Sequence, residues 1–224
     1  MIKRVDAVIF DYDGTIVDTE KLYFQVMSDL VRKYTGRELE KLGYIYNVSG
    51  TSVERCREYI TSEYNMEEKI YDKLEREVAV EMADRIINAE ILPYIEETFI
   101  FLKENNIKIG VASNGTLEHI IDGLKKHDLY RYVDDIVTKY DVERGKPHPD
   151  IYLMSAERLG VNIENCIAVE DSRPGALAAS KSGAYLILQT NDITKHLDFT
   201  DVDYKIKNCN LLEEVKKKVL NNLK

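Results

Sequence analysis

Cysteine is scarce in this 224-residue chain, which contains only Cys56, Cys166 and Cys209. Because the three are odd in number, widely separated and without a CxxC pair, a disulfide framework is excluded and reduced thiols are expected. No apolar run approaches the ~20 residues that a membrane-spanning helix needs. The strand-like VDAVIF follows MIKR at once, so we expect no signal peptide and a cytoplasmic protein.

Positive charge is also in short supply. The chain has 31 lysines and arginines against 40 acidic residues, and its formal net charge is -9. This balance excludes a broad electrostatic attraction to nucleic acid or to anionic membranes. An anionic ligand would have to be held by local donors or by a metal ion. Internal repeats and low-complexity segments are absent too, and the length predicts one large domain or a domain with an insertion.

Short apolar runs bounded by turn residues recur along the chain and predict strands. They cover 5–10, 107–113, 166–171, 184–189 and, more weakly, 133–138. Strands that are apolar on both faces are typical of a parallel sheet covered by helices on each side. Helical patterns lie between them or close the chain, at 93–106, 116–128, 149–160 and 211–224. The alternation predicts a doubly wound, mainly parallel α/β sheet. A turn is expected over 172–175.

One interval interrupts the alternation. From Thr19 to Asn88 the patterns are helical, with no convincing strand. Apolar residues recur there every four positions, at Leu22, Val26 and Leu30 and again at Ile70, Leu74, Val78 and Met82. Such stripes let helices pack on one another as a small bundle. We therefore predict a helical cap domain over 19–88, inserted into an α/β core domain made of 1–18 and 89–224. Its connections, near 14–20 and 88–93, are expected to act as hinges.

Two acidic residues, Asp11 and Asp13, directly follow the first predicted strand in VIFDYDGT. Residues two apart in an extended chain point to the same side, so both carboxylates face one space while Tyr12 points away. Like charges this close require a cation between them or a proton on one of them. Hard oxygen ligands of this kind suit Mg²⁺. A turn-capping pair or a structural Ca²⁺ site is the alternative, although the stretch lacks the full ligand series of a Ca²⁺ loop.

Polar residues end the other predicted strands as well. Ser113 and Asn114 stand where a helix begins, and helix N-termini bind anions, although such residues also form ordinary turns and caps. Glu170 and Asp171 end CIAVED, and Lys146 in RGKPHPD supplies a positive charge, although alone it would be taken for a surface residue. In open α/β sheets the ligand site lies at the carboxyl ends of the strands. These residues are therefore predicted to share one site.

The stretches DYDGTIVDTE, VASNG, RGKPHPD and VEDS, in this order and spacing, resemble the four motifs of the haloacid dehalogenase (HAD) superfamily. The resemblance covers essentially the whole chain, including a helical cap after the first motif. It is closest to the capped β-phosphoglucomutase and phosphoglycolate phosphatase-like group. The second acid of the first motif separates phosphotransferases from the dehalogenase branch. The resemblance implies a Mg²⁺-dependent phosphatase that hydrolyses a small phosphorylated metabolite.

The resemblance also implies a role for each motif residue. Asp11 is the nucleophile that forms an aspartyl-phosphate. Asp13 protonates the leaving oxygen and then deprotonates the hydrolytic water. Ser113, with Asn114 nearby, hydrogen-bonds the phosphoryl oxygens, and Lys146 bridges the nucleophile and the phosphate. These roles agree with the demands of phosphoryl transfer, which needs mainly positioning and charge stabilisation.

The implied Mg²⁺ ligands are Asp11, the backbone carbonyl of Asp13, and Asp171, with Glu170 supporting the ion or coordinating it through water. Substrate choice is assigned to side chains of the cap. The candidates, for each of which core packing or a plain surface position is the alternative, are Tyr44, Tyr46, Thr51 and Arg55.

Two other functions compete with the phosphatase. The mutases have a His in the first cap helix and an Arg after a short VS sequence, where this chain has Tyr23 and Gly50, so a sugar-phosphate mutase is less favoured. A HAD-like phosphate-binding or regulatory module without turnover is the non-enzymatic alternative, but the catalytic acids are all present. Of the four histidines only His148 lies near a motif, and a loop role is expected for it. Monomer and homodimer are both left open.

Overall fold

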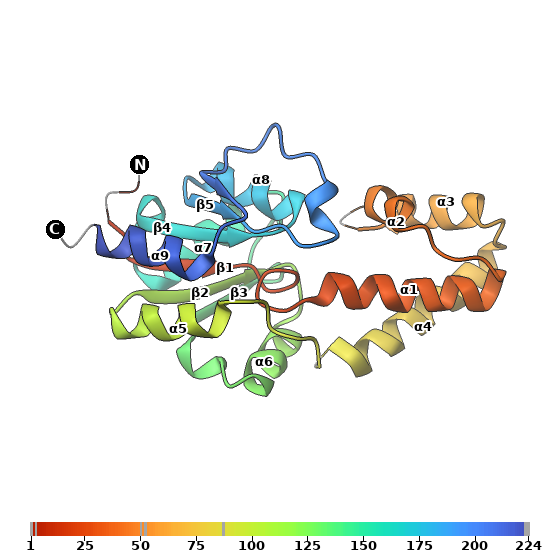
Figure 1. Cartoon of the computed structure of the whole chain (residues 1–224), viewed down its shortest axis with the longest axis horizontal. Helices are drawn as coiled ribbons and strands as arrows, with labels where there is room; N and C mark the ends of the chain where they lie inside the picture. The colour runs from red at the N-terminus through yellow and green to blue at the C-terminus, as the bar shows by residue number, and fades with distance from the viewer. Residues whose placement is uncertain (1, 3, 50, 52, 87, 222–224) are drawn as a thin grey trace.

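The computed structural model describes residue 2 and residues 4–49, 51, 53–86 and 88–221. Within these ranges the strands form one sheet in one half of the molecule, and helices α1–α4 lie together in the other half (Figure 1). Both ends of the described chain lie far from these four helices.

The strands are β1 (Ala7–Phe10), β2 (Lys108–Ser113), β3 (Asp135–Thr138), β4 (Cys166–Glu170), β5 (Tyr185–Leu188) and β6 (Ile206–Lys207). The α-helices are α1 (Thr19–Thr35), α2 (Lys41–Asn47), α3 (Val53–Glu63), α4 (Glu68–Ile86), α5 (Ile95–Glu104), α6 (Leu117–Lys126), α7 (Asp150–Leu159), α8 (Arg173–Ser182) and α9 (Leu211–Leu220).

The sheet has the strand order β3-β2-β1-β4-β5-β6, and every described pairing is parallel. The predicted doubly wound α/β fold is therefore confirmed. The order of strands along the chain reverses beside β1, and in such sheets ligands bind in the crevice at the carboxyl ends of the strands on either side of that point. Phe10 pairs with Val111 of β2 and with Val169 of β4, so the ends of these three strands lie level.

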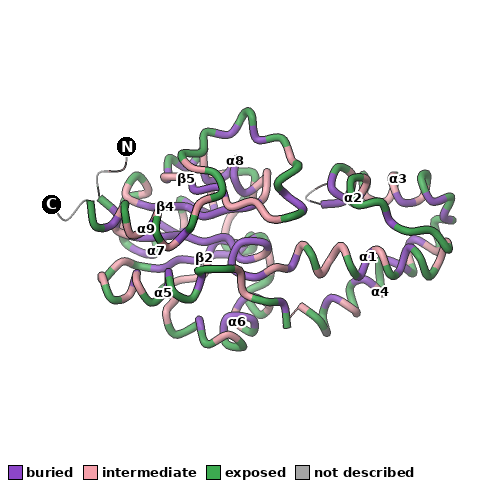
Figure 2. Tube along the Cα trace, viewed as in Figure 1, coloured by how far each residue is buried: buried purple, intermediate pink, exposed green. Residues whose placement is uncertain are grey.

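Each face of the sheet packs against its own set of helices. Val8 and Phe10 belong to a core shared with helices α5, α6 and α9, whereas Ala7 and Ile9 belong to a core shared with α7 and α8. All four side chains are fully buried. Successive residues of a strand point to opposite faces, so a strand covered on both sides must be apolar at every position. This is why the strands appear as continuous apolar runs in the sequence. Figure 2 shows the labelled strands β2 and β4 as largely buried segments of the trace.

Helices α1–α4 have a hydrophobic core of their own. Val26 and Leu30 of α1 pack there with Leu74, Val78 and Met82 of α4, so the predicted apolar stripes are confirmed. The two chain connections to the sheet half are hydrogen-bonded to each other. The Asp18 amide donates to the Glu90 carbonyl over 2.9 Å, and the Leu92 amide donates to the Ile16 carbonyl over 2.9 Å. The division into a cap over 19–88 and a core of 1–18 and 89–224 stays a prediction.

Two local predictions differ from the structure. The predicted turn over 172–175 is wrong, because Ser172 is the N-cap of α8 and its Oγ accepts a hydrogen bond from the Gly175 amide over 3.1 Å. Strand β6 has two residues and is not predicted by the sequence. Among the described residues it is recognised by its parallel pairing with β5. The predicted closing helix corresponds to α9, and residues 222–224 lie outside the described chain. Over the described ranges, no helix combines the length and apolar character needed to cross a bilayer.

Candidate active site

Four of the predicted site residues meet at the carboxyl ends of the central strands. Asp11 follows β1, Glu170 ends β4 and Asp171 follows it, while Lys146 lies in the loop between β3 and α7. The Lys146 ammonium donates to Asp11 Oδ1 and to Glu170 Oε1. The lysine and these two carboxylates are 4%, 8% and 0% exposed in their side chains. This is a buried charged cluster, which supports one shared site at this edge of the sheet.

Two glycines allow the backbone to approach these acids closely. Gly14 has φ 83°, in the left-handed region, and a Cβ there would lie 2.4 Å from Asp171 Oδ2. Gly175, in the first turn of α8, has its backbone against the other acid, since a Cβ there would lie 1.8 Å from Glu170 Oε1. Any side chain at either position would displace a carboxylate. The tight packing holds Glu170 and Asp171 in fixed places.

Glu170 is held by hydrogen bonds from the protein at both of its oxygens. The Tyr152 hydroxyl donates to Oε1 over 2.7 Å, and the Ser172 hydroxyl donates to Oε2 over 3.2 Å. On the far side of the lysine, the Lys146 amide donates to Asn114 Oδ1 over 3.1 Å. Burial disfavours the ammonium, but Asp11 and then Glu170 outweigh this effect and raise the pKa of Lys146 above its ordinary value. Lys146 is therefore a fixed positive charge.

The acids Asp11, Glu170 and Asp171 suit a divalent cation. Each offers an oxygen within 4.8 Å of the others, and all three residues are buried. Burial, then repulsion from Glu170, raises the pKa of Asp11 to about 8; burial, then Asp11 and Glu170, raises the pKa of Asp171 well above its usual range. Without a cation, Asp11 and Asp171 therefore keep their protons to higher pH than usual. Once all three acids are ionised, the lysine leaves two negative charges, which is the charge that one Mg²⁺ ion would neutralise. Hard oxygen donors are the ligands that Mg²⁺ prefers, so the donor set fits this ion.

Asp13 lies next to the cluster and contacts a residue that the sequence reasoning missed. His119 Nε2 is 3.0 Å from Asp13 Oδ1, and the His119 ring packs edge-on against Tyr12, whose side chain points away into the core as predicted. His119 stands three residues after Thr116, the N-cap of α6, and so belongs to the first turn of the helix that follows β2. No local pattern in the sequence marks it. The sequence singles out His148 instead, because that histidine lies near a motif.

The remaining motif residues surround the same edge. Ser113 is 2% exposed at the end of β2, and its Oγ accepts a hydrogen bond from the Gly115 amide over 2.9 Å. A Cβ on Gly115 would lie 3.4 Å from Asp13 Oδ2, so Ser113 and Asp13 flank one short segment. The contacts of Asn114 are with the backbone of Lys146. A direct contact of Ser113 or Asn114 with phosphate stays a prediction.

The predicted cap residues differ in their surroundings. Tyr44 is 1% exposed and packs against Phe24 within the core of helices α1–α4, whereas Tyr46 is 52% exposed. Thr51 and Arg55 line a cavity between these helices and the sheet half. Gly50, one of the two positions compared with the mutases, lies outside the described residues. The role of all four cap residues in substrate choice stays a prediction.

Comparison with known proteins agrees with the fold. The family model for haloacid dehalogenase-like hydrolases matches residues 8–188, and the chain belongs to this family. It is 31% identical over 214 residues to YhcW of Bacillus subtilis, covering 93% of this chain and 94% of that protein. It is 30% identical over 187 residues to the phosphorylated carbohydrates phosphatase of Thermotoga maritima, covering 80% of this chain and 82% of that protein. The crystal structure of β-phosphoglucomutase from Clostridium difficile matches with a TM-score of 0.71 and 28% identity, covering 98% of this chain and 99% of that one. The predicted family is confirmed.

Proposed function

We propose that this chain is a Mg²⁺-dependent phosphatase that hydrolyses a small phosphorylated metabolite, of the sugar-phosphate kind, through a phosphorylated Asp11. The buried cluster of Asp11, Lys146, Glu170 and Asp171, with Asp13 beside it, is the observation that carries the proposal. The names of relatives add support, since one of them is a phosphorylated carbohydrates phosphatase.

In the proposed reaction a carboxylate oxygen of Asp11 attacks the phosphorus of the substrate. The bond between phosphorus and the ester oxygen breaks, and Asp13 gives its proton to that oxygen, so the alcohol leaves. Water then attacks the phosphorus, Asp13 accepts the proton of this water, and the bond to Asp11 breaks to release inorganic phosphate. The nucleophile divides one difficult displacement into two easier ones. Ser113 and Lys146 are assigned to the phosphoryl oxygens.

The side chains of Asp11 and Asp171 and the backbone carbonyl of Asp13 would hold the Mg²⁺ ion. We assign Glu170 a supporting role rather than direct coordination of the ion, because its oxygens already accept hydrogen bonds from Tyr152, Ser172 and Lys146. When bound, the ion supplies charge stabilisation to the phosphoryl oxygens. Glu170 acts mainly by fixing Lys146.

We assign His119 as a positioning residue for Asp13. In the tautomer with the proton on Nε2, His119 donates to Asp13 Oδ1 and restricts the rotation of that carboxyl group. We expect His119→Ala to lower kcat about 10-fold and to change KM by less than about twofold, because orientation matters in the transition state and less in substrate binding. His119→Gln keeps a donor and should recover part of the loss. Steady-state rates for both variants test this; a rise in KM with kcat unchanged would contradict it.

The likeness to a β-phosphoglucomutase favours one second candidate, a sugar-phosphate mutase. Phosphate release and glucose-phosphate interconversion should therefore be followed side by side over a panel of phosphorylated metabolites, with Mg²⁺ or with EDTA. Release that needs the metal would support the phosphatase. Interconversion without net release would support the mutase, and folded protein silent in both assays would leave a phosphate-binding or regulatory module as the better description.

A further inference from the structure

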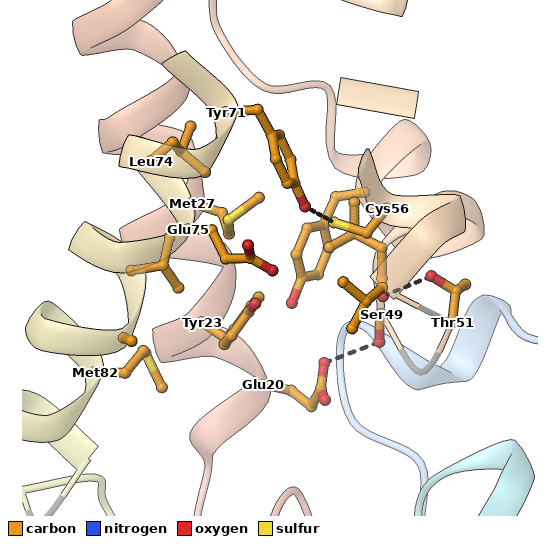
Figure 3. Close-up of a pocket in the computed structure, with 15 residues that line it drawn as sticks. Glu20, Tyr23, Met27, Ser49, Thr51, Cys56, Tyr71, Leu74, Glu75 and Met82 are labelled. Atoms are coloured by element: carbon orange, nitrogen blue, oxygen red, sulfur yellow. Dashed lines mark hydrogen bonds between the residues drawn. The ribbon is translucent and has the colours of Figure 1, made fainter. Parts of the chain in front are cut away.

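Helices α1–α4 enclose a cavity of about 430 Å³, a size typical of small-molecule sites. Figure 3 shows it between α1, α4 and the segment that leads into α3. Its apolar lining includes four side chains that are 9% exposed or less, namely Met27, Leu74, Val78 and Met82. The hydroxyl groups of Tyr23 and Tyr71 face the same space (Figure 3). The cavity therefore combines an apolar surface with neutral hydrogen-bonding groups.

One end of this cavity lies close to the catalytic cluster. Glu20, in the first turn of α1, lines the cavity and accepts a hydrogen bond from Ser49 Oγ over 2.9 Å. Glu20 also lines the neighbouring cavity, which includes Pro147 and Ser172, the residues that directly follow Lys146 and Asp171 in the chain. An organic group attached to a phosphate at Asp11 can thus extend past Glu20 into the cavity.

The charged residues that line this cavity, among those that the structure describes, are both acidic. Glu20 lies at the end near the sheet, and Glu75 of α4 turns its carboxylate into the cavity farther along (Figure 3). The nearest guanidinium to Glu75 is that of Arg57, at 3.5 Å, and Arg57 does not line the cavity. Arg57 also pairs with Glu68 at 2.9 Å and Asp72 at 2.7 Å, so one cation is shared by three carboxylates. The charges that line the cavity are therefore negative, and that of Glu75, whose side chain is 47% exposed, is partly in contact with solvent.

We propose that this cavity receives the organic part of the phosphate ester and selects against a second negative charge on it. The inference rests on the proposed phosphatase function. A carboxylate or second phosphate would lose water there and meet two like charges, whereas hydroxyl groups or an amine would find acceptors and an apolar surface. The substrate class is thus a phosphomonoester whose organic part is neutral or cationic.

A neighbouring cavity is the alternative binding place for the organic part of the substrate. It shares Glu20, Ser49 and Thr51 with the first, but it runs between the helices and the sheet half and includes Arg55 and Arg173. An anionic organic part would be better placed there. Arg173 is already paired with Asp201, at 3.0 and 2.9 Å through its two terminal nitrogens, which favours the first cavity for substrate.

The test compares three C6 phosphates that differ in the charge of the organic part: glucitol 6-phosphate, which is neutral, 6-phosphogluconate, which has the same open chain with a carboxylate at C1, and glucosamine 6-phosphate, which carries an amine. We expect kcat/KM for the full chain with Mg²⁺ to be about 10-fold or more lower for 6-phosphogluconate than for the other two at low ionic strength. The difference should shrink as salt is added, because screening weakens repulsion between partly exposed charges. Equal values, or a preference for 6-phosphogluconate, would overturn the proposal.

A matched pair of variants links the effect to the cavity. Glu75→Gln should reduce the ratio of kcat/KM values between the neutral and the anionic compound about threefold. Glu81→Gln, which removes a carboxylate of α4 that pairs with Arg85 and does not line the cavity, should leave this ratio unchanged. Equal effects of the two variants would contradict the assignment. Binding of the same three compounds to Asp11→Asn, measured by calorimetry, gives the ranking without turnover. If the three compounds bind in the expected order of affinity but the wild type releases no phosphate, the charge selection is supported and the proposed phosphatase function is overturned.

Discussion

Asp11→Asn should lower the rate of phosphate release by about four orders of magnitude or more, as expected for loss of a nucleophile. The amide has nearly the shape of the carboxylate but cannot attack phosphorus. Asp11 is 6% exposed, and its backbone amide stays bonded to the Val169 carbonyl over 2.9 Å, so the fold should be kept. Initial rates, with a thermal melt to confirm folding, measure the effect.

A control for this substitution is available on the same strand. Asp6 precedes β1 at its other end, where its Oδ2 accepts a hydrogen bond from Asn165 Nδ2 over 2.8 Å. Asp6→Asn should keep the rate within about twofold. In the wild type, borohydride reduction of the acyl phosphate followed by mass spectrometry should mark Asp11. An Asp11→Asn rate within about 10-fold of the wild type would exclude this residue as the nucleophile.

The second large effect is on stability. Lys146→Met should lower the free energy of unfolding by about 3 kcal/mol or more in EDTA, because removing one partner of a buried ion pair leaves the other charges uncompensated. The side chains involved, Lys146, Asp11 and Glu170, are all less than a tenth exposed, so solvent does little to screen the loss. Urea unfolding followed by circular dichroism measures it. Lys139→Met, an exposed lysine in the same loop, is the control and should change little.

The pH dependence of Lys146→Met has a definite sign. Asp11 has a pKa raised from 3.8 to about 8, so the folded protein binds this proton more tightly than the unfolded chain does. The stability that comes with the bound proton is lost as pH rises through this interval. With Lys146 gone the repulsion among the acids is stronger and the pKa of Asp11 rises further, so the stability deficit of the variant should grow as the pH rises past about 8. If the difference in the free energy of unfolding between the wild type and Lys146→Met shrinks as the pH rises, repulsion among the buried carboxylates is not what destabilises the variant.

Much of the sheet could be predicted from the sequence because its strands are buried on both faces. A run such as VDAVIF has no polar alternation, and this alone favours a parallel sheet between helical layers. Strand β6 could not be predicted in this way, since Ile206 and Lys207 form too short a segment to show a period. The sequence predicts a turn where α8 begins, because Ser, Pro and Gly also form turns. The hydrogen bond from the Gly175 amide to Ser172 identifies this segment as a helix N-terminus.

The site was predictable where side chains follow strands and less so where they lie on helices. Asp11, Glu170 and Asp171 come together because parallel strands end at one edge, which the sequence already indicates. His119 and Glu20 could not be placed, because the face that a helical side chain presents depends on where the helix begins and how it is oriented. The N-caps Asp18 and Thr116 set those starts. The negative cavity, made by four helices, depends on their packing and has no local sequence signal.

The paired connections between the two halves of the molecule limit how these halves can rearrange. Since the backbone of Asp18 is bonded to that of Glu90, and Leu92 to Ile16, the two crossings form a short ribbon that resists sliding. Rotation about this ribbon is the rearrangement that keeps both bonds. Under such a rotation, points near the axis, such as Glu20, would stay almost fixed relative to Asp13, whereas Arg55, on α3, would travel along an arc. One wall of the cavity that Glu20 and Arg55 both line would thus keep its position while the opposite wall moved.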